Sequence, residues 1–294
     1  MSPTGRPVGE HRSAQREGTP ASAARFPVSP RALFATVVDH GSLLWQFARR
    51  EISGRYRGSL LGFGWAVVNP LLLLAIYTFV FSVVFGMRWD GPVTDRAGFA
   101  LLVYAGMVVH GFFAECVTRA PTLVVDHRNL VKRVVFPLQL LPWSALVVAA
   151  FHLAVGVLLI AGAVVVRTGA LPAQVLALPL VVAPLALFAL GFTYAFAALG
   201  VYLRDLSQLV GFLALTLLFL SPVFYPASAV PEGWRWLIAV NPLALFIEMV
   251  RGCLIHGAWP DLRALAALWA VALAIAWLGF YGFQRTRRGF ADVL

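Results

Sequence analysis

Long apolar stretches separated by short polar segments make up most of the chain from residue 62 onward. A helix needs about 20 apolar residues to cross the roughly 30 Å of hydrocarbon in a bilayer, where it satisfies its own backbone hydrogen bonds. Each stretch meets that length, so the pattern predicts an all-α integral membrane protein with six transmembrane helices. We expect these spans at residues 62–86, 99–118, 138–166, 178–203, 206–225 and 264–284.

One further apolar stretch, residues 237–257, is interrupted by polar groups. It contains the pair Asn241-Pro242 and two charges, Glu248 and Arg251, which are three residues apart and can pair on a helix. We expect an outer re-entrant helical hairpin before the last span rather than a seventh span. Tryptophans that suit a membrane interface flank it: Trp234, Trp236 and Trp259.

The N-terminal part contains no predicted span. Residues 1–28 are rich in Ser, Pro, Gly, Ala and Arg and have almost no bulky apolar side chains, so we expect a disordered arm. Residues 29–61 are expected to form an amphipathic helix at the cytoplasmic interface, and residues 62–294 the six-span domain.

Composition excludes a soluble enzyme and a nucleotide loop. Of the 294 residues, 60% are apolar and 12% charged, and the mean hydropathy is +0.82, whereas soluble domains are about a quarter charged. Lys132 is the only lysine among 23 basic residues, and Arg133 follows it. A Walker A loop needs Lys followed by Ser or Thr, so if ATP drives this protein, another chain must bind the ATP. Cys116 and Cys253 have no metal-ligand pattern around them.

Loop charges predict the orientation. If the N-terminus is cytoplasmic, 17 of the 23 basic residues lie in inside segments. Cytoplasmic loops of membrane proteins carry such an excess of Lys and Arg. We therefore expect both termini on the cytoplasmic side of the membrane.

Residues 43–57 have the pattern of a basic amphipathic helix. At 100° per residue, Gln46, Arg49, Arg50 and Arg57 share one arc, and apolar side chains fill most of the remainder. Glu51 and Arg55 fall in the apolar face, where their spacing predicts an ion pair. Such a helix anchors on anionic lipid; a docking surface for a partner and a cationic rim for an anionic lipid substrate remain open as further roles.

Two polar segments separate spans on the same side. Residues 119–137 contain a helix-length piece between Pro121 and Pro137, with apolar positions at helical spacing. That spacing favours a short cytoplasmic helix that inserts into a partner, although a solvated basic loop is the simpler alternative. Residues 203–208 predict a tight cytoplasmic turn, with a second partner contact as an option.

Acidic and histidine side chains within the spans show no catalytic pattern. Glu115 precedes Arg119 by four residues, which predicts a local ion pair. His110 and His152 are expected to hydrogen-bond to neighbouring helices. No triad, metal cluster or pair of carboxylates can be assembled from these residues.

Aromatic residues gather near the predicted outer ends of the first and fifth spans. Interface belts explain most of them, but aromatic faces also stack on sugar rings, so we name them as candidate channel-lining residues for a carbohydrate. They are Tyr77, Phe81, Phe85, Phe219, Phe224 and Tyr225.

The order of these elements resembles a known family, the membrane permeases of type-2 ABC exporters, and within it the branch that exports O-antigen, teichoic acid or mycobacterial galactan. The resemblance covers residues 30–294. It is carried by REISGRYRGSLLGFGWAVVNPLL (50–72), NLVKRVVFP (129–137), YLRDLSQ (202–208), SPVFYP (221–226), NPLALFIEMVRG (241–252) and GFADVL (289–294).

The resemblance implies several partners. These are a second copy of this chain, two copies of a nucleotide-binding ATPase that hold ATP and Mg, membrane lipid and a polyprenyl-linked glycan, but no nucleic acid. The segment 121–135 is similar to the coupling helix of that family. Residues implied in ATPase docking are Arg49, Arg50, Asp126, Arg128, Asn129, Leu130, Lys132 and Arg133.

The function implied is export of a lipid-pyrophosphate-linked polysaccharide, with cell-wall galactan as one candidate cargo. Because Arg forks suit phosphate oxygens, Arg55 and Arg57, with Tyr56 between them, are the candidate pyrophosphate contacts. The alternatives are a type-2 ABC permease for drugs or small lipids, and an integral membrane glycosyltransferase or acyltransferase.

Overall fold

A computed structural model describes residues 28–87, 89, 95–131 and 136–294, and these are all helical or irregular, without strands. Five helices in this part of the chain are long and apolar enough to cross a membrane, or six if one bent pair counts as a span. The all-helical membrane fold is therefore confirmed. The predicted N-terminal arm lies almost wholly outside the described residues.

The helices follow one another along the chain with short connections. They are α1 (Pro30–Tyr56), η1 (Gly62–Gly64), α2 (Trp65–Thr78), η2 (Phe79–Val84), α3 (Arg96–Asp126), α4 (Arg128–Val131), α5 (Leu140–Thr168), η3 (Ala173–Ala177), α6 (Leu178–Tyr202), α7 (Leu206–Leu220), η4 (Ala227–Ala229), η5 (Glu232–Trp234), α8 (Arg235–Val240), α9 (Pro242–Arg251), η6 (Gly252–His256), α10 (Leu262–Thr286), η7 (Arg287–Gly289) and α11 (Phe290–Val293).

Helices α3, α6 and α10 form the packed centre of the bundle. A Cβ atom on Gly279 of α10 would overlap the carbonyl oxygen of Gly191 on α6, and one on Gly200 of α6 would overlap the backbone of Pro121 on α3. Only glycine permits backbones to approach so closely. Small residues at helix contacts are typical of membrane bundles, where van der Waals packing replaces the hydrophobic drive between helices.

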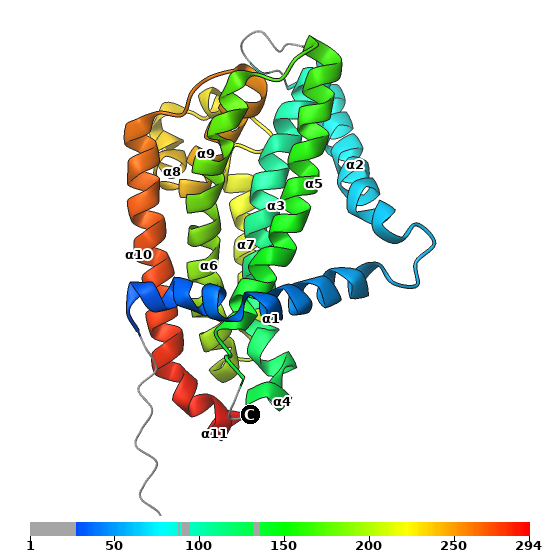
Figure 1. The fold of residues 1–294 in the computed structure, drawn as a ribbon. Coiled ribbons are helices and arrows are strands. Elements are labelled where there is room, and N and C mark those ends of the chain that lie inside the picture. The colour runs from blue at the N-terminus through cyan, green and yellow to red at the C-terminus, as the bar shows by residue number, and fades with distance from the viewer. Residues whose placement is uncertain (1–27, 88, 90–94, 132–135) are drawn as a thin grey trace, which may run out of the picture.

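The basic amphipathic helix predicted within residues 29–61 is present as α1, which crosses one end of the bundle (Figure 1). Its buried face includes Leu44, Ala48, Ile52 and Tyr56, whereas Arg49 and Arg50 are exposed. The end that carries α1, α4 and α11 is called the α1 end below, and the opposite end the far end.

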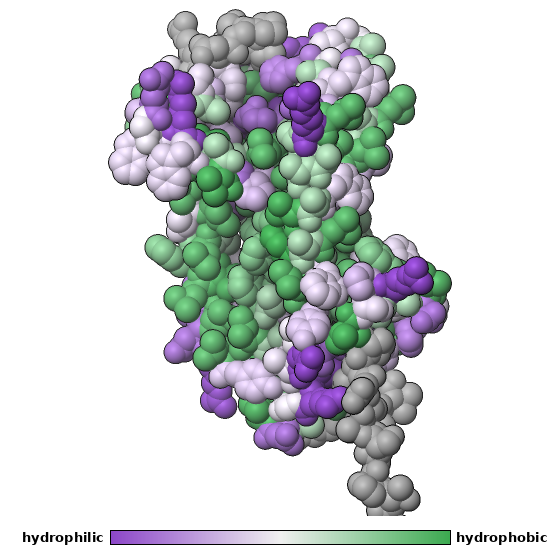
Figure 2. Space-filling model, turned by 90° about the vertical axis from the view of Figure 1, so that its left-hand side faces the viewer, coloured by the Kyte–Doolittle hydropathy of each residue, from purple (hydrophilic) through white to green (hydrophobic). Residues whose placement is uncertain are grey.

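The outer surface agrees with a membrane-spanning bundle. Figure 2 shows hydrophobic side chains in a band across the middle of one face, with hydrophilic side chains gathered toward both ends. The exposed apolar side chains of α10 contribute to the lipid-compatible surface of that helix, among them Leu262, Leu273 and Leu278. Apolar surface exposed at mid-height needs no protein cover if hydrocarbon surrounds it.

Residues 232–256 form two helical pieces that meet at an angle of 87°. The bend falls at Asn241, whose side chain caps α9 by accepting a hydrogen bond from the Leu243 amide. Both pieces lie in the half of the bundle away from α1 (Figure 1). A bent helical pair thus stands where the outer hairpin was predicted, while its depth in the membrane stays a prediction.

Two predicted boundaries are wrong. The fifth span, predicted over 206–225, is helical only as α7, Leu206–Leu220, which at 1.5 Å per residue is about 22 Å long. The second span does not stop at residue 118: α3 continues through Pro121 to Asp126. Pro121 was taken as a helix boundary, but the helix passes through it, and the backbone of Pro121 packs against Gly200.

Candidate functional site

Two adjoining cavities lie between α2, α3 and α5. The first, which we call the vestibule, has a volume of about 590 Å³ and is lined by Arg55, Tyr56, Ser59, Trp65, Ala66, Asn69, Pro70, Glu115 and His152. The second, which we call the chamber, has a volume of about 340 Å³. The two share Asn69, Pro70, Glu115 and His152, so they lie next to each other.

Helix α2 stands away from the bundle and so leaves room for both cavities (Figure 1). None of the most apolar part of the segment Gly62–Val84 is buried within the chain. Its start follows a turn in which Gly58 and Gly62 have φ of 83° and 50°, which is the left-handed region that glycine tolerates. The turn lets the chain leave α1 and enter α2 in a new direction.

A polar network closes the vestibule on the side of α3 and α5. The Arg55 guanidinium donates to Glu115 Oε1 at 2.6 Å, and His152 Nδ1 lies 2.7 Å from Glu115 Oε2. The Tyr56 hydroxyl lies 2.8 Å from His152 Nε2. With neutral His152 donating from Nδ1 to the carboxylate, Nε2 accepts from Tyr56. The network ties α1 to α3 and α5.

This network corrects two predicted ion pairs. Glu115 pairs with Arg55 rather than with Arg119, and Arg119 instead contacts Glu51 of α1. The predicted pairs within single helices are replaced by pairs between α1 and α3, because α1 lies directly against α3 and α5 there. The predicted pair of Glu248 and Arg251 is confirmed at 2.8 Å.

The three candidate pyrophosphate contacts have different surroundings. The Arg55 side chain is 41% exposed and lines the vestibule. Tyr56 is buried, and burial raises the pKa of its phenol, so it stays a neutral hydrogen-bonding group. Arg57 is exposed and follows the end of α1. Tyr56 and Arg55 therefore face one cavity, while Arg57 stands beside it.

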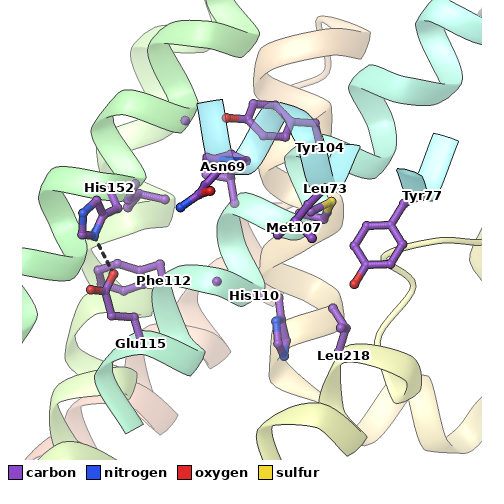
Figure 3. A pocket seen from close by; sticks show the side chains of 15 residues that line it. Asn69, Leu73, Tyr77, Tyr104, Met107, His110, Phe112, Glu115, His152 and Leu218 are labelled. Atoms are coloured by element: carbon purple, nitrogen blue, oxygen red, sulfur yellow. Dashed lines mark hydrogen bonds and ion pairs between the residues drawn. The ribbon is translucent and has the colours of Figure 1, made fainter. Parts of the chain in front are cut away.

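The chamber is mainly apolar and has a few polar groups. It is lined by the four shared residues and by Leu73, Tyr77, Tyr104, Met107, Val108, His110, Gly111, Phe112, Leu153, Gly156 and Leu218. Figure 3 shows Glu115, His152 and Phe112 on one side and Tyr77, His110 and Leu218 on the other. His110 Nε2 lies 2.9 Å from the carbonyl of Ala214, which is the interhelical bond expected of a histidine in a span.

The predicted channel aromatics gather into one cluster. Phe224 stands at its centre, with ring centroids 4.7 Å from both Tyr77 and Phe81 and 5.7 Å from Phe219. Phe85 contacts Phe81 at 5.7 Å, and the Tyr225 hydroxyl donates to the Phe219 carbonyl. Phe224 is buried, so it supports the cluster rather than lining open space, whereas Phe85 and Phe219 are exposed.

The predicted docking residues fall mostly on the exposed surface at the α1 end. Arg49, Arg50, Asp126, Arg128 and Asn129 are exposed, and Leu130 packs partly against the core. In place of a separate helix over 121–135, the chain has the end of α3 and the short α4. Lys132 and Arg133 lie outside the described residues.

Sequence reasoning missed two residues of the chamber and the interhelical role of Arg251. Asn69 and Tyr104 line the chamber, and a polar Asn next to a proline in an apolar run was the available signal for Asn69. Arg251 is fully buried and bonds to the carbonyls of Leu102 and Val223, with its guanidinium 4.7 Å from the Trp89 ring. It holds the bent pair against α3 near the far end.

Comparison with known proteins agrees with this arrangement. The sequence profile described as "ABC-2 type transporter" matches residues 42–255. The chain is 31% identical over 264 residues to the O-antigen export system permease protein RfbA of Myxococcus xanthus, covering 88% of this chain and 98% of that protein.

Two proteins of the same name from Klebsiella pneumoniae are also similar. They are 26% and 25% identical over 253 residues, which cover 86% of this chain and 95% of each relative. All of these relatives are permeases by name. Since the family profile covers most of the described bundle, from α1 to the end of the bent pair, the chain belongs to the ABC-2 type transporter family.

Proposed function

We propose that two copies of this chain form the membrane part of an ATP-driven exporter in a bacterial inner membrane. The exporter moves a lipid-pyrophosphate-linked polysaccharide out of the cytoplasm, and cell-wall galactan is a candidate cargo. Two copies of a separate ATPase bind ATP and Mg. In this proposal the chain is a permease subunit without an enzymatic centre, and both termini lie in the cytoplasm.

The observation that carries the proposal is the vestibule. A half-exposed Arg55 faces a cavity that begins beside α1 and continues between transmembrane helices. A guanidinium at the mouth of such a cavity suits phosphate oxygens, which it binds through two parallel hydrogen bonds. The long match to relatives named as O-antigen export permeases supports a glycan as the group attached to that phosphate.

The second copy is supported by the uncovered faces of α2 and α7. Apolar side chains on α2, such as Leu72 and Ile76, and on α7, such as Leu213, are about half exposed. These two helices flank the chamber. A second copy placed against them would close a channel that both vestibules enter.

The ATPase contact is proposed for the α1 end, where Asp126, Arg128 and Asn129 are exposed beside Arg49 and Arg50. Replacing Asp126 and Asn129 together with Ala should reduce co-purification of the proposed ATPase partner. The bundle itself should unfold at the same temperature as the wild type. Unchanged co-purification would contradict this assignment.

The pyrophosphate role is tested by replacing Arg55 and Arg57 with Ala in cells that depend on this chain. We expect lipid-linked glycan to accumulate on the cytoplasmic side and surface glycan to fall. Arg263→Ala, at an exposed position in the first turn of α10, is the matched control and should leave both unchanged. Normal export in the double variant would exclude these arginines as pyrophosphate contacts.

A further inference from the structure

The guanidinium of the vestibule already holds a carboxylate. Arg55 donates to Glu115 Oε1 through Nη1 at 2.6 Å, and the described residues supply no second hydrogen-bond acceptor for it. The remaining N–H groups of a guanidinium are free to bind an anion, and the Arg55 side chain is 41% exposed. An anion bound there shares one guanidinium with Glu115, so two negative charges lie side by side.

This contact between like charges is costly, because the carboxylate has little water around it. The Glu115 side chain is only 16% exposed. Among the residues that line the vestibule, Arg55 and Glu115 are the two with permanent charges at neutral pH, and these charges cancel. A bound anion therefore gives the cavity an excess of negative charge, and charges repel more strongly where water is scarce. A further positive charge beside Glu115 would remove this cost.

His152 can supply that charge by taking up one proton. Its Nδ1 lies 2.7 Å from Glu115 Oε2 (Figure 3), and its Nε2 lies 2.8 Å from the Tyr56 hydroxyl. In the neutral form, Nδ1 donates to the carboxylate and Nε2 accepts from the hydroxyl. After a proton binds at Nε2, that nitrogen donates to the hydroxyl oxygen, which also accepts hydrogen bonds. His152 therefore keeps both of its hydrogen bonds in either protonation state.

The other charged and titratable groups around this pair have partners elsewhere or lie in solvent. Arg119 of α3 contacts Glu51 of α1, and Arg57 is exposed beyond the end of α1. His110 contacts the carbonyl of Ala214 on α7, and Cys116 is a buried thiol. Helix α2 brings no titratable side chain to the lining of the vestibule. The charge of the vestibule is thus governed by Arg55 and the pair formed by Glu115 and His152.

We propose that Glu115 and His152 form a proton site that is filled when an anion binds to Arg55. The proton belongs to the pair rather than to either residue, because the two groups interact directly. Ionisable side chains in membrane helices are costly and mark functional sites. The inference rests on the proposed function, which places a pyrophosphate at Arg55, and it adds regulation of that site by protons.

The direction of the pH dependence follows from linkage. At low pH the pair already carries its proton, and the anion binds without further change. At higher pH a proton must be taken from solution, so binding becomes weaker. Uptake of a single proton changes the dissociation constant by at most about tenfold per pH unit. Histidine ordinarily titrates between about pH 5 and about pH 8, and this is the range to measure.

The experiment measures the dissociation constant of one probe for the full-length permease in phosphatidylcholine nanodiscs. The probe is farnesyl pyrophosphate with a methyl ester on its terminal phosphate. Both phosphates of this diester stay ionised across the range, so the probe itself does not titrate. We expect the dissociation constant of the wild type to rise by at least about threefold per pH unit in part of the range from about pH 5 to about pH 8.

Two variants identify the proton site. Glu115→Gln removes the repelling charge and should tighten binding at about pH 8 by at least about threefold. A residue that only holds the helices together would not give this gain, because its loss weakens the site. Glu115→Gln combined with His152→Asn removes both titrating groups, so the dissociation constant of the double variant should not depend on pH.

Two matched controls change the same residue types elsewhere. Glu248→Gln removes another carboxylate that is paired with an arginine. His127→Asn removes another histidine whose Nδ1 has a hydrogen-bond partner, the carbonyl of Leu123. Neither residue lines the vestibule. Both variants should keep the dissociation constant of the wild type and its dependence on pH.

Three results would overturn the inference. They are a wild-type dissociation constant that does not change with pH, a pH dependence that persists in the double variant, and unchanged or weaker binding in Glu115→Gln at about pH 8. The last result would mean that the carboxylate positions Arg55 for the anion. The profile of the wild type alone decides the matter if a variant fails to fold.

The proposed function fails in a different way, namely if Arg55→Ala binds the probe as tightly as the wild type. If the probe does not bind the wild type at any pH, both proposals are rejected. Lost binding in Arg55→Ala together with a flat profile of the wild type would leave the pyrophosphate site in place without the proton site.

Discussion

The contact between α6 and α10 and the surface of α2 represent opposite extremes of packing in one bundle. At the first, the backbones meet so closely that Gly191 and Gly279 admit no Cβ atom. At the second, the most apolar part of the segment Gly62–Val84 is not buried at all within the chain. Both segments are apolar, so hydrophobicity alone does not distinguish them; the size of the side chains does.

This difference separates a tightly packed scaffold from a sparsely packed helix. Small residues along α6 and α10 give extensive van der Waals contact, which stabilises helix pairs in lipid. Helix α2 contacts α3 and α5, with the cavities between them, and it contacts the aromatic cluster around Phe224. Within the single chain, α2 is therefore held by fewer close contacts than α6 and α10 are, and a second copy would have to supply the rest.

The largest effect is expected from breaking the scaffold. Leucine at Gly279 would overlap the Gly191 carbonyl, and the rigid backbone on α6 cannot retreat without separating the two helices. We expect Gly279→Leu to abolish accumulation of folded protein, measured by size-exclusion chromatography of a fluorescent fusion. Gly162→Leu, at an open position on α5, should behave as the wild type. Normal folding of Gly279→Leu would show that the contact is not rigid.

A smaller but still large effect is expected at Arg251, which joins the bent pair to α3. Arg251→Met leaves the carbonyls of Leu102 and Val223 without their donor and removes the contact with Glu248. Charge-assisted hydrogen bonds contribute about 1.5–3 kcal/mol each, so a loss of roughly 3 kcal/mol of unfolding free energy is expected.

Thermal unfolding in detergent measures this loss. Arg263→Met removes an exposed arginine from the same end of the bundle and provides the comparison. Equal unfolding temperatures for the two variants would mean that Arg251 does not hold the bent pair in place.

The sequence predicted the elements of the fold better than the contacts between them. Apolar run length identified the long helices, and the Asn-Pro pair at 241–242 marked the bend. The sequence could not show that Glu115 pairs with Arg55 rather than with Arg119. Both pairings neutralise the charge of Glu115, and only the path of α1 decides between them. Local spacing favours pairs within a helix, but tertiary packing replaced them.

The same limit applies to the candidate site. Arginines at the end of α1 could be proposed from their position, and Arg55 does line the vestibule. Tyr104 could not be selected, because an apolar run gives no indication of which tyrosine will line a cavity. Pro121 was misread for a related reason: a proline usually ends a helix, yet here close packing against Gly200 carries α3 past it.

A moderate effect is expected in the network that joins α1 to α3 and α5. Glu115→Gln removes the charge that accepts from Arg55 and His152 while keeping the size of the side chain. We expect a loss of about 1–2 kcal/mol, because part of each bond weakens to a neutral one and Arg55 is half exposed. Thermal unfolding should show this loss.

Comparison with Glu248→Gln tests whether the loss of stability depends on where the glutamate lies or only on the loss of its charge. Glu248 also pairs with an arginine, but its side chain is 45% exposed. The Glu115 variant should lose more stability than the Glu248 variant. The reverse order would mean that the vestibule network does not hold α1 against α3 and α5.

The smallest effect is expected at the far end, where Asp95 precedes α3. Arg167 of α5 donates to both carboxylate oxygens of Asp95 at 2.6 and 2.7 Å. These hydrogen bonds hold the pKa of Asp95 below its ordinary value of 3.8. Because the folded pKa is the lower one, the pair adds stability above the unfolded pKa and loses it as pH falls through the folded pKa.

The unfolding temperature of the wild type should therefore fall between about pH 5 and about pH 3 more steeply than that of Asp95→Asn, which cannot titrate there. Asp292→Asn, at an exposed site in α11, should keep the wild-type slope. The difference should be slight, since Asp95 is open to solvent and water screens the pair. A difference as large as that at Glu115 would mean that the connection between α3 and α5 at the far end is as important as the network at α1, and that the looseness is confined to α2.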